Sequence, residues 1–211
     1  MSADRIKVLC DLDESIVNVC EASDLELLPD NFQNRFDYKD IVAYGMRVFA
    51  RPGLQEYLDF LFDNFDVSVF TAAEQEYAMF IVMNFMLCKP GRKIHHIFFR
   101  YHNDMALKRY DGMKDLRLLW YVYNVPGFHP CNTVIVDDLI DVYETNPNNT
   151  IRVKAFRLVQ DGHAMLDAVD DKELPRVQKV LTTLDENFKH SSCPRQLYLG
   201  QAPNETSPFL L

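Results

Sequence analysis

Polar side chains capable of phosphate or metal chemistry follow each of three short apolar runs in this sequence. The runs and the residues after them are 6–10 with Asp11-Leu12-Asp13-Glu14-Ser15, 67–70 with Thr71, and 133–136 with Asp137-Asp138. If the runs form adjacent parallel strands, their carboxyl ends meet at one edge of the sheet. The four aspartates and the hydroxyl group of Thr71 would then share a single crevice.

Four carboxylates in one crevice repel one another unless a cation offsets their charge. Oxygen ligands without His or Cys favour a hard ion, so the sequence predicts a Mg²⁺ site at Asp11, Asp13, Asp137 and Asp138. Two carboxylates that are two residues apart, beside Mg²⁺, suit phosphoryl transfer, because one can attack phosphorus while the other handles the proton of the leaving group. An Asp-x-Asp pair on its own would more often be a turn or a solvated cap. The three strand ends in order, with a lysine between the second and the third, favour catalysis.

The order of elements around these residues predicts an α/β fold with a parallel sheet and crossover helices. The apolar runs read as buried strands, and helical spacing occurs over 54–65, 74–87 and 115–123. Further elements are expected as a strand or hairpin arm at 41–49, strands at 94–100 and 151–156, and a closing helix at 172–188.

Composition limits the classes of protein that this chain can represent. With 211 residues and 48% hydrophobic residues, it has the size and composition of one folded domain, which we expect over 1–189, followed by a tail at 190–211. A formal charge of −9 argues against direct nucleic-acid binding, and no apolar stretch is long enough for a membrane span. The five cysteines include no Cys-x-x-Cys pair, which favours reduced thiols. Reduced thiols favour an intracellular location, in the nucleus or the cytoplasm. If the source is a virus, the location would be within the host cell.

The polar residues also resemble the motifs of the haloacid dehalogenase superfamily. Those motifs are Asp-x-Asp-x-Thr, a strand-end Thr or Ser, a Lys and an acidic pair, and they match Asp11 to Ser15, Thr71, Lys114 and Asp137-Asp138. Within the superfamily the chain resembles the FCP/SCP-type phosphatases of the RNA polymerase II carboxy-terminal domain over roughly residues 5 to 188, which include Arg51-Pro52-Gly53-Leu54, Phe99-Arg100 and Asp171-Lys172-Glu173-Leu174. The resemblance implies a three-layer, Rossmann-like, mostly parallel sheet flanked by helices, with small β insertions and no large cap.

The resemblance also implies catalytic roles. Asp11 is expected to be the nucleophile that forms an aspartyl-phosphate. Asp13 would protonate the leaving group, activate water afterwards and offer its backbone carbonyl to the metal. Thr71 would hydrogen-bond a phosphoryl oxygen, although a strand-end threonine can also be only a helix N-cap. Lys114 would hold Asp11 and the phosphate.

Other roles follow from the same resemblance or from charge. Asp138 is expected to be the direct metal ligand of the acidic pair, with Asp137 orienting Lys114 or a metal-bound water. Arg100 and Ser15 are expected to contact substrate, and Arg109 would belong to a basic rim. Ser15 departs from the family's threonine but keeps the hydroxyl, and the segment between Lys114 and Asp137 is longer than usual.

A site without a large cap is open to solvent and can admit a phosphorylated side chain of a protein. The expected reaction is therefore Mg²⁺-dependent Ser/Thr phosphoprotein hydrolysis, on the phosphorylated carboxy-terminal domain of RNA polymerase II or a similar phosphopeptide. Two alternatives stay open. One is a phosphatase for nucleic-acid ends or small molecules, and the other is a phosphopeptide-binding module without catalysis.

Overall fold

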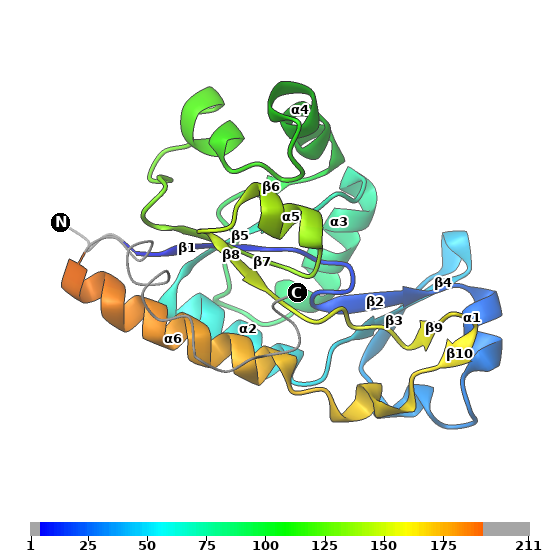
Figure 1. Cartoon of the computed structure of the whole chain (residues 1–211). Coiled ribbons are helices and arrows are strands. Elements are labelled where there is room, and N and C mark those ends of the chain that lie inside the picture. The colour runs from blue at the N-terminus through cyan, green and yellow to red at the C-terminus, as the bar shows by residue number, and fades with distance from the viewer. Residues whose placement is uncertain (1–4, 192–211) are drawn as a thin grey trace.

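A five-stranded sheet forms the centre of the computed structural model, which describes residues 5–191 (Figure 1). The strand order is β6-β5-β1-β7-β8, and every neighbouring pair is parallel. The strands are β1 Lys7–Cys10, β5 Asp66–Phe70, β6 Ile97–Phe98, β7 Thr133–Asp137 and β8 Thr150–Arg152. After β1, the strands β5 and β6 add to one side of it, and β7 and β8 then add to the other side. The strand order therefore reverses at β1, where open sheets of this kind form their crevice.

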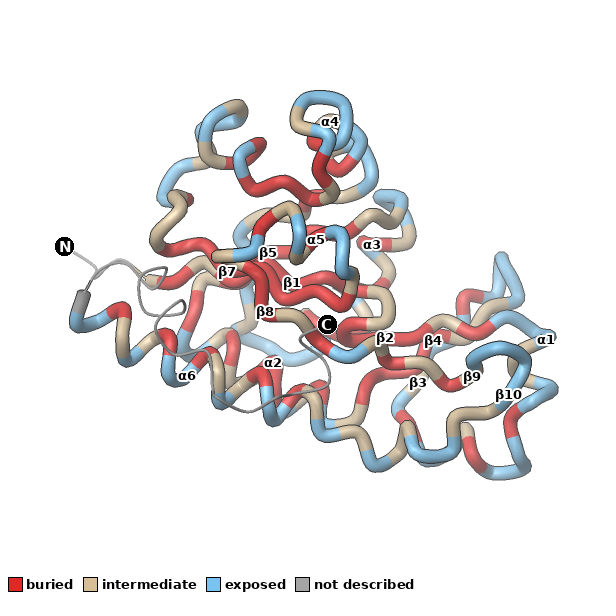
Figure 2. The backbone as a smooth tube through the Cα atoms, viewed as in Figure 1, coloured by how far each residue is buried: buried red, intermediate tan, exposed pale blue. Residues whose placement is uncertain are grey.

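Helices cover both faces of this sheet, which is why its strands read as continuous apolar runs. Val8 and Cys10 face a core shared with α2 and α6, whereas Leu9 faces a second core that includes Val142 of α5. In Figure 2 the strands form a buried layer between these helices. The helices are α2 Leu54–Asn64, α3 Gln75–Ile81, α4 Arg100–Tyr110, α5 Ile140–Thr145 and α6 Glu173–Ser191. The α/β, mostly parallel architecture predicted from the sequence is confirmed.

A small antiparallel sheet, inserted between β1 and α2, packs beside the end of the large sheet. Its order is β2-β4-β3, and a short hairpin of β9 and β10 lies near it. A third core, which includes Phe36, Phe49 and Phe156, holds this part together. Its elements are β2 Val17–Cys20, α1 Ala22–Leu27, β3 Tyr38–Ile41, β4 Met46–Ala50, β9 Val159–Gln160 and β10 His163–Ala164. Within residues 5–191 these are the only β insertions, and none forms a separate cap domain.

Several predicted elements differ in detail. The stretch 41–49 is the turn and second arm of a hairpin, because a 3₁₀ turn at Val42–Tyr44 separates β3 from β4. Only Ile97–Phe98 of the stretch 94–100 is a strand, and α4 begins at Arg100. The helix predicted at 74–87 ends in a π-helical turn, and the one predicted at 115–123 is a π-helical turn at Leu118–Val122. The closing helix runs to Ser191, and the rest of the predicted tail lies outside the described residues.

The cysteines do not all follow the sequence-based expectation. Cys10, Cys20 and Cys88 are free thiols, but Cys131 is disulfide-bonded, so the prediction of reduced thiols throughout is wrong at this residue. Thiol pairing depends on proximity in space, which the spacing of cysteines along the chain does not reveal. No helix among the described residues is long and apolar enough to cross a membrane.

Candidate active site

The predicted catalytic residues meet where the central strands end. Asp11 follows β1 directly, Thr71 follows β5, and Asp137 is the last residue of β7. The backbone N–H of Asp11 donates to the carbonyl of Val136 at 3.0 Å, so the sheet's hydrogen bonding continues past the last strand residue and fixes the position of Asp11. The parallel register therefore brings the three polar strand ends to one edge, as the sequence predicts.

Lys114 is a buried cation that joins two of the aspartates. Its Nζ lies 2.6 Å from Asp11 Oδ1 and 2.7 Å from Asp137 Oδ2, and the exposed fractions of Lys114, Asp11 and Asp137 are 1%, 4% and 0%. Burial alone would lower the pKa of Lys114, but Asp11 and Asp137 raise it above its ordinary value, so the ammonium stays charged. Burial and the neighbouring Asp11 raise the pKa of Asp137 to about 7.

Two asparagines fix the backbone at Lys114, which adopts a left-handed conformation with φ of 47°. The backbone N–H of Lys114 donates to Asn103 Oδ1 at 2.9 Å, and its carbonyl accepts from Asn146 Nδ2 at 3.2 Å. Asn146 Oδ1 also accepts the backbone N–H of Leu116 at 3.0 Å. The sequence analysis missed both asparagines, since each is far along the chain from Lys114 and belongs to no local pattern.

Asp11, Asp137 and Asp138 form a compact acidic group that could hold a metal ion. Each is buried, and their ligand oxygens lie within 4.8 Å of one another. Ser15 Oγ lies 3.2 Å from both Asp11 Oδ2 and Asp138 Oδ1, which places the predicted Ser15 within this group. Burial and the charge of Asp11 raise the pKa of Asp138 to about 6. Lys114 offsets only part of the charge of these three carboxylates, and oxygen donors alone fit a hard divalent cation such as Mg²⁺.

Asp13 has a different environment from these three aspartates. Its carboxylate lies outside their acidic group, and its Oδ1 accepts a hydrogen bond from the hydroxyl of Tyr77 in α3. Burial raises the pKa of Asp13 to about 6, although the Tyr77 hydrogen bond lowers it. A carboxyl group with such a pKa can exchange a proton near neutral pH, which an acid–base catalyst requires. Tyr77 had no predicted role, because one polar residue in a helix gives no signal of its own.

Arg51 supports the loop that follows β1, residues 11–16. Its side chain is fully buried and donates to Asp171 at 2.8 and 2.9 Å, and also to the backbone carbonyls of Ser15 and Lys154, each at 2.8 Å. Asp171 also accepts the backbone N–H of Glu173 at 2.9 Å, at the start of α6. This one guanidinium therefore ties the loop after β1 to the start of the last helix.

Replacing Arg51 by methionine is expected to lower the free energy of unfolding by about 3–5 kcal/mol, because it leaves Asp171 and two carbonyls without their donor. Urea unfolding measures this loss. Arg47→Met is the matched control, because Arg47 pairs with the half-exposed Asp40 on the small sheet and should cost about 1 kcal/mol or less. If the two variants lose the same free energy of unfolding, the structural role assigned to Arg51 would be wrong.

Thr71, Arg100 and Arg109 were also predicted to contact substrate or phosphate. Thr71 is buried, and its Oγ1 accepts the backbone N–H of Ala73 at 3.1 Å, which leaves its hydroxyl hydrogen for another acceptor. Arg100 is half-exposed at the start of α4, where it pairs with Glu74 at 3.1 Å and donates to the carbonyl of Ala72 at 3.2 Å. Arg100 therefore lies next to the end of β5, where Thr71 is located.

Arg109 lies in the last turn of α4, at the opposite end of the helix from Arg100. Its guanidinium is 5.8 Å from the centre of the Tyr110 ring. Its predicted contact with substrate stays a prediction, as do those of Arg100 and Ser15.

Comparison with known proteins identifies the family. The family model of NLI interacting factor-like phosphatases matches residues 6–192. The chain belongs to this phosphatase family. It is 35% identical over 181 residues to the CTD phosphatase-like protein 355R of Invertebrate iridescent virus 6, across 82% of this chain and 96% of the relative. It is 34% identical over 189 residues to the protein of the same description in Invertebrate iridescent virus 3, across 83% of this chain and 95% of the relative.

Two solved structures have a fold similar to that of this chain. Fcp1, described as an essential RNA polymerase II CTD phosphatase, matches with a TM-score of 0.62 at 15% identity, across 88% of this chain and 63% of that one. A beta-phosphoglucomutase structure from Thermotoga maritima matches with a TM-score of 0.51 at 14% identity, across 84% of this chain and 99% of that one. This chain thus spans less than two thirds of the Fcp1 chain. The structural matches support the shared fold of this family member.

Proposed function

We propose that this chain is a Mg²⁺-dependent phosphatase that removes phosphate from serine or threonine side chains of proteins through an aspartyl-phosphate on Asp11. The observation that carries the proposal is the position of Asp11, at the end of the central strand and 2.6 Å from the buried ammonium of Lys114. A carboxylate oxygen of Asp11 would attack phosphorus while the bond to the serine oxygen breaks. Lys114 would offset charge on the phosphoryl oxygens.

Asp13 would move the protons in both half-reactions. In the first it gives a proton to the departing serine oxygen, and in the second it takes a proton from the water that releases phosphate from Asp11. Its raised pKa of about 6 suits both steps. Asp13 is partly exposed, whereas Asp11 and Lys114 are buried, so we expect substrate to enter from the side of Asp13.

Mg²⁺ would be held by Asp11, Asp137 and Asp138, where it would supply charge neutralisation for the transferred phosphoryl group. Saturating Mg²⁺ is expected to stabilise the protein by about 2–3 kcal/mol and to raise its melting temperature by about 5–10 °C relative to EDTA. Differential scanning calorimetry measures this shift. Asp138→Asn should abolish most of it, whereas Asp30→Asn, at an exposed residue away from the strand ends, should retain it. A full shift in Asp138→Asn would contradict the assignment.

The substrate class rests on two arguments. The relatives in iridescent viruses are described as CTD phosphatase-like, and the solved Fcp1 is described as an RNA polymerase II CTD phosphatase. The β insertions of residues 5–191 also form no separate cap domain, so a protein side chain has room to reach Asp13. We therefore assign a phosphoserine peptide of the polymerase tail or a similar protein as substrate. The viral relatives favour a host-cell setting for this reaction.

Measuring phosphate release distinguishes a phosphoprotein phosphatase from a small-molecule or nucleic-acid-end phosphatase and from a binding module without catalysis. With Mg²⁺ present, kcat/KM for a phosphoserine peptide of the polymerase repeat should exceed that for a sugar phosphate or a 5′-phosphorylated oligonucleotide by about tenfold or more, a difference of about 1.4 kcal/mol. Preference for the sugar phosphate or the oligonucleotide would contradict the substrate class. Peptide binding without phosphate release would favour a non-catalytic module.

A further inference from the structure

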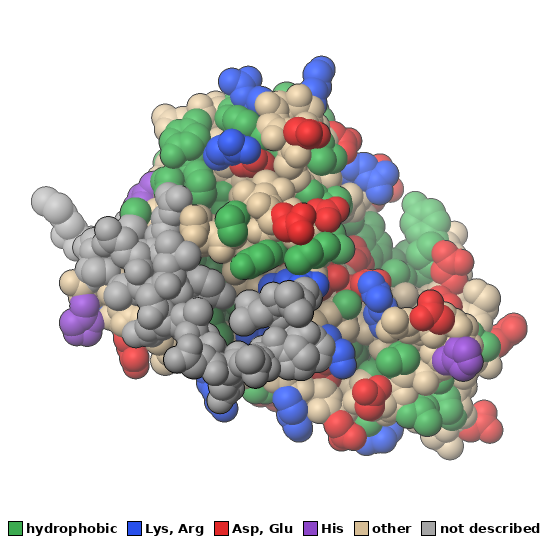
Figure 3. Space-filling model, in the orientation of Figure 1, with side chains coloured by type: hydrophobic (Ala, Val, Ile, Leu, Met, Phe, Trp, Pro, Cys, Tyr) green, Lys and Arg blue, Asp and Glu red, His purple; other side chains and the backbone are tan. Residues whose placement is uncertain are grey.

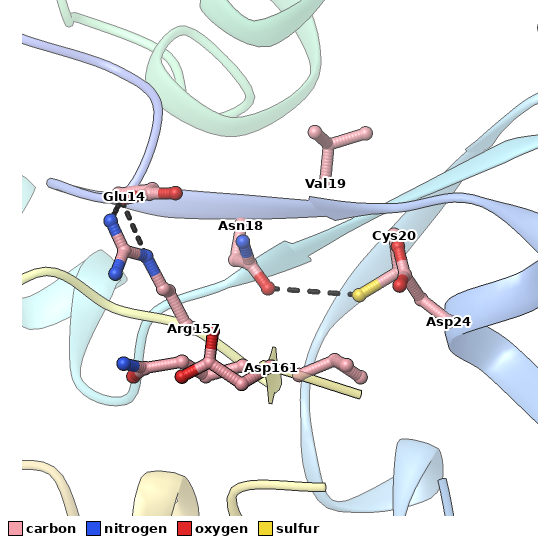
Figure 4. Close-up of a pocket in the computed structure, with 9 residues that line it drawn as sticks. Glu14, Asn18, Val19, Cys20, Asp24, Arg157 and Asp161 are labelled. Atoms are coloured by element: carbon pink, nitrogen blue, oxygen red, sulfur yellow. Dashed lines mark hydrogen bonds and ion pairs between the residues drawn. The ribbon is translucent and has the colours of Figure 1, made fainter. Parts of the chain in front are cut away.

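An open pocket of about 340 Å³ lies beside the loop that follows β1, and the proposed reaction does not use it (Figure 4). One wall comes from β2 and α1, and the other comes from residues 157–161. Glu14, which stands between Asp13 and Ser15, lines the pocket. The carbonyl of Glu14 accepts the backbone N–H of Phe156 at 2.6 Å, so the loop is tied to the chain that forms the far wall. An occupant would therefore touch the loop that carries Asp13.

The pocket carries an excess of negative charge. Its lining includes the carboxylates of Glu14, Asp24 and Asp161 and the single guanidinium of Arg157. Glu14 already pairs with Arg157, whose Nε lies 2.7 Å from Glu14 Oε2. Within residues 5–191, neither Asp24 nor Asp161 forms a salt bridge. Figure 3 shows acidic side chains over the region of α1 and the β9–β10 hairpin. A cationic group is thus the ligand that the pocket's charge favours.

Asn18 adds an unused hydrogen-bond donor to this pocket. The residue is 8% exposed, and its side chain extends from β2 toward residues 157–161 (Figure 4). Its Oδ1 accepts the backbone N–H of Leu158 at 2.9 Å and lies 3.6 Å from Cys20 Sγ. Its Nδ2 donates to no group in the described part of the chain. Because Asn18 lines the open pocket, this N–H is left for a group that enters it, and a ligand carbonyl could accept from it.

We propose that this pocket docks a lysine or arginine side chain of the phosphoprotein substrate, at a residue separate from the phosphorylated one. The basic group would lie at Asp24 and Asp161, and a peptide carbonyl would accept from Asn18 Nδ2. A peptide supplies both groups at once, which a free metal ion does not. The inference rests on the proposed function only in assigning the docked segment to a substrate.

Binding of unphosphorylated peptides tests the pocket without any need for catalysis. A fluorescent peptide with two lysines should bind the full chain about fivefold or more tightly than its glutamine analogue in fluorescence anisotropy at low salt, as expected for about 1 kcal/mol from paired charges. The double variant Asp24→Asn/Asp161→Asn should lose this preference. In the wild type, Asp24 accepts a hydrogen bond from the backbone N–H of Glu21 at 3.1 Å. The amide oxygen of an asparagine at position 24 would still accept this bond, so α1 should still form. The control Asp30→Asn/Asp167→Asn removes the same charge from exposed residues outside the pocket and should retain the preference.

Kinetics with the phosphoserine forms of the same peptides test docking of substrate. The lysine form should have a KM about fivefold lower than the glutamine form, and the double variant should lose this difference while its kcat on an aryl phosphate stays unchanged. Equal binding of the two peptides by the wild type, a lysine preference that survives in the double variant, or equal KM values would each overturn the proposal. Lysine-dependent binding without phosphate release from any compound would instead refute the proposed catalytic function.

Discussion

Asp11→Asn is expected to lower kcat for an aryl phosphate by about 10,000-fold or more, since removing a nucleophile typically costs this much or more. The asparagine side chain keeps the shape of aspartate but cannot form the acyl-phosphate. Lys114 retains Asp137 as its partner at 2.7 Å, so the variant should still fold. Because the substitution also removes one of three clustered carboxylates, the free energy of unfolding should not fall by more than about 1 kcal/mol.

Mass spectrometry after an acid quench gives an independent measurement of the same prediction. The wild type mixed with an aryl phosphate should gain one phosphoryl group on the peptide that contains Asp11, and Asp11→Asn should gain none. Asp167→Asn, at an exposed residue of the 3₁₀ turn Leu166–Asp170, is the matched control and should behave as the wild type does. Near-normal kcat in Asp11→Asn would mean that Asp11 only ligates the metal and that water attacks phosphorus directly.

The sequence predicted the strand ends well because burial on both faces makes each central strand a short apolar run. Once β1, β5 and β7 are parallel neighbours, the polar residues that follow them must share an edge, so Asp11, Thr71 and Asp137 could be placed without coordinates. Lys114 lies at no strand end and follows no apolar run. Its proposed role came from the resemblance to a known family, and its contacts with Asp11 and Asp137 support that proposal.

The supports of the site were the part that the sequence did not reveal. Asn103 and Asn146 hold the backbone of Lys114 from α4 and from the end of α5, and such pairings depend on how the helices pack. Tyr77 reaches Asp13 because α3 begins close to the end of β5. The sequence also left open whether 41–49 is a strand or a hairpin arm, because a lone glycine such as Gly45 within β-prone residues can mark a bulge as well as a turn.

Lys114→Met is expected to have the second largest effect, on both activity and stability. Removing the cation that pairs with both Asp11 and Asp137 should lower kcat by about 100- to 1,000-fold, the usual cost of losing a charge-stabilising donor at the reacting group. In EDTA it should also lower the free energy of unfolding by about 3–5 kcal/mol, because Asp11 and Asp137 then lose the buried cation that pairs with both. Lys108→Met, at an exposed position of α4, is the control and should change neither quantity by a comparable amount.

The pH dependence of this loss of stability has a definite sign. Without Lys114 the pKa of Asp137 in the folded variant should lie further above its value in the unfolded chain, so the folded state keeps this proton to higher pH than the unfolded state does. The free energy of unfolding of Lys114→Met should therefore fall between pH 5 and pH 8 relative to the wild type, in which Lys114 stays charged over this range. Urea unfolding at the two pH values in EDTA measures the difference. If the variant is less stable than the wild type by the same amount at pH 5 and at pH 8, the loss would come from packing rather than from uncompensated charge.

A second substitution separates the electrostatic role of Lys114 from its catalytic role. Adding Asp137→Asn to Lys114→Met removes one uncompensated carboxylate, so part of the lost stability at pH 8 should return. Activity should not return, because the added asparagine restores no positive charge near Asp11. Recovery of kcat together with stability would mean that Lys114 acts only by keeping the fold intact, and that another group balances the charge on phosphate.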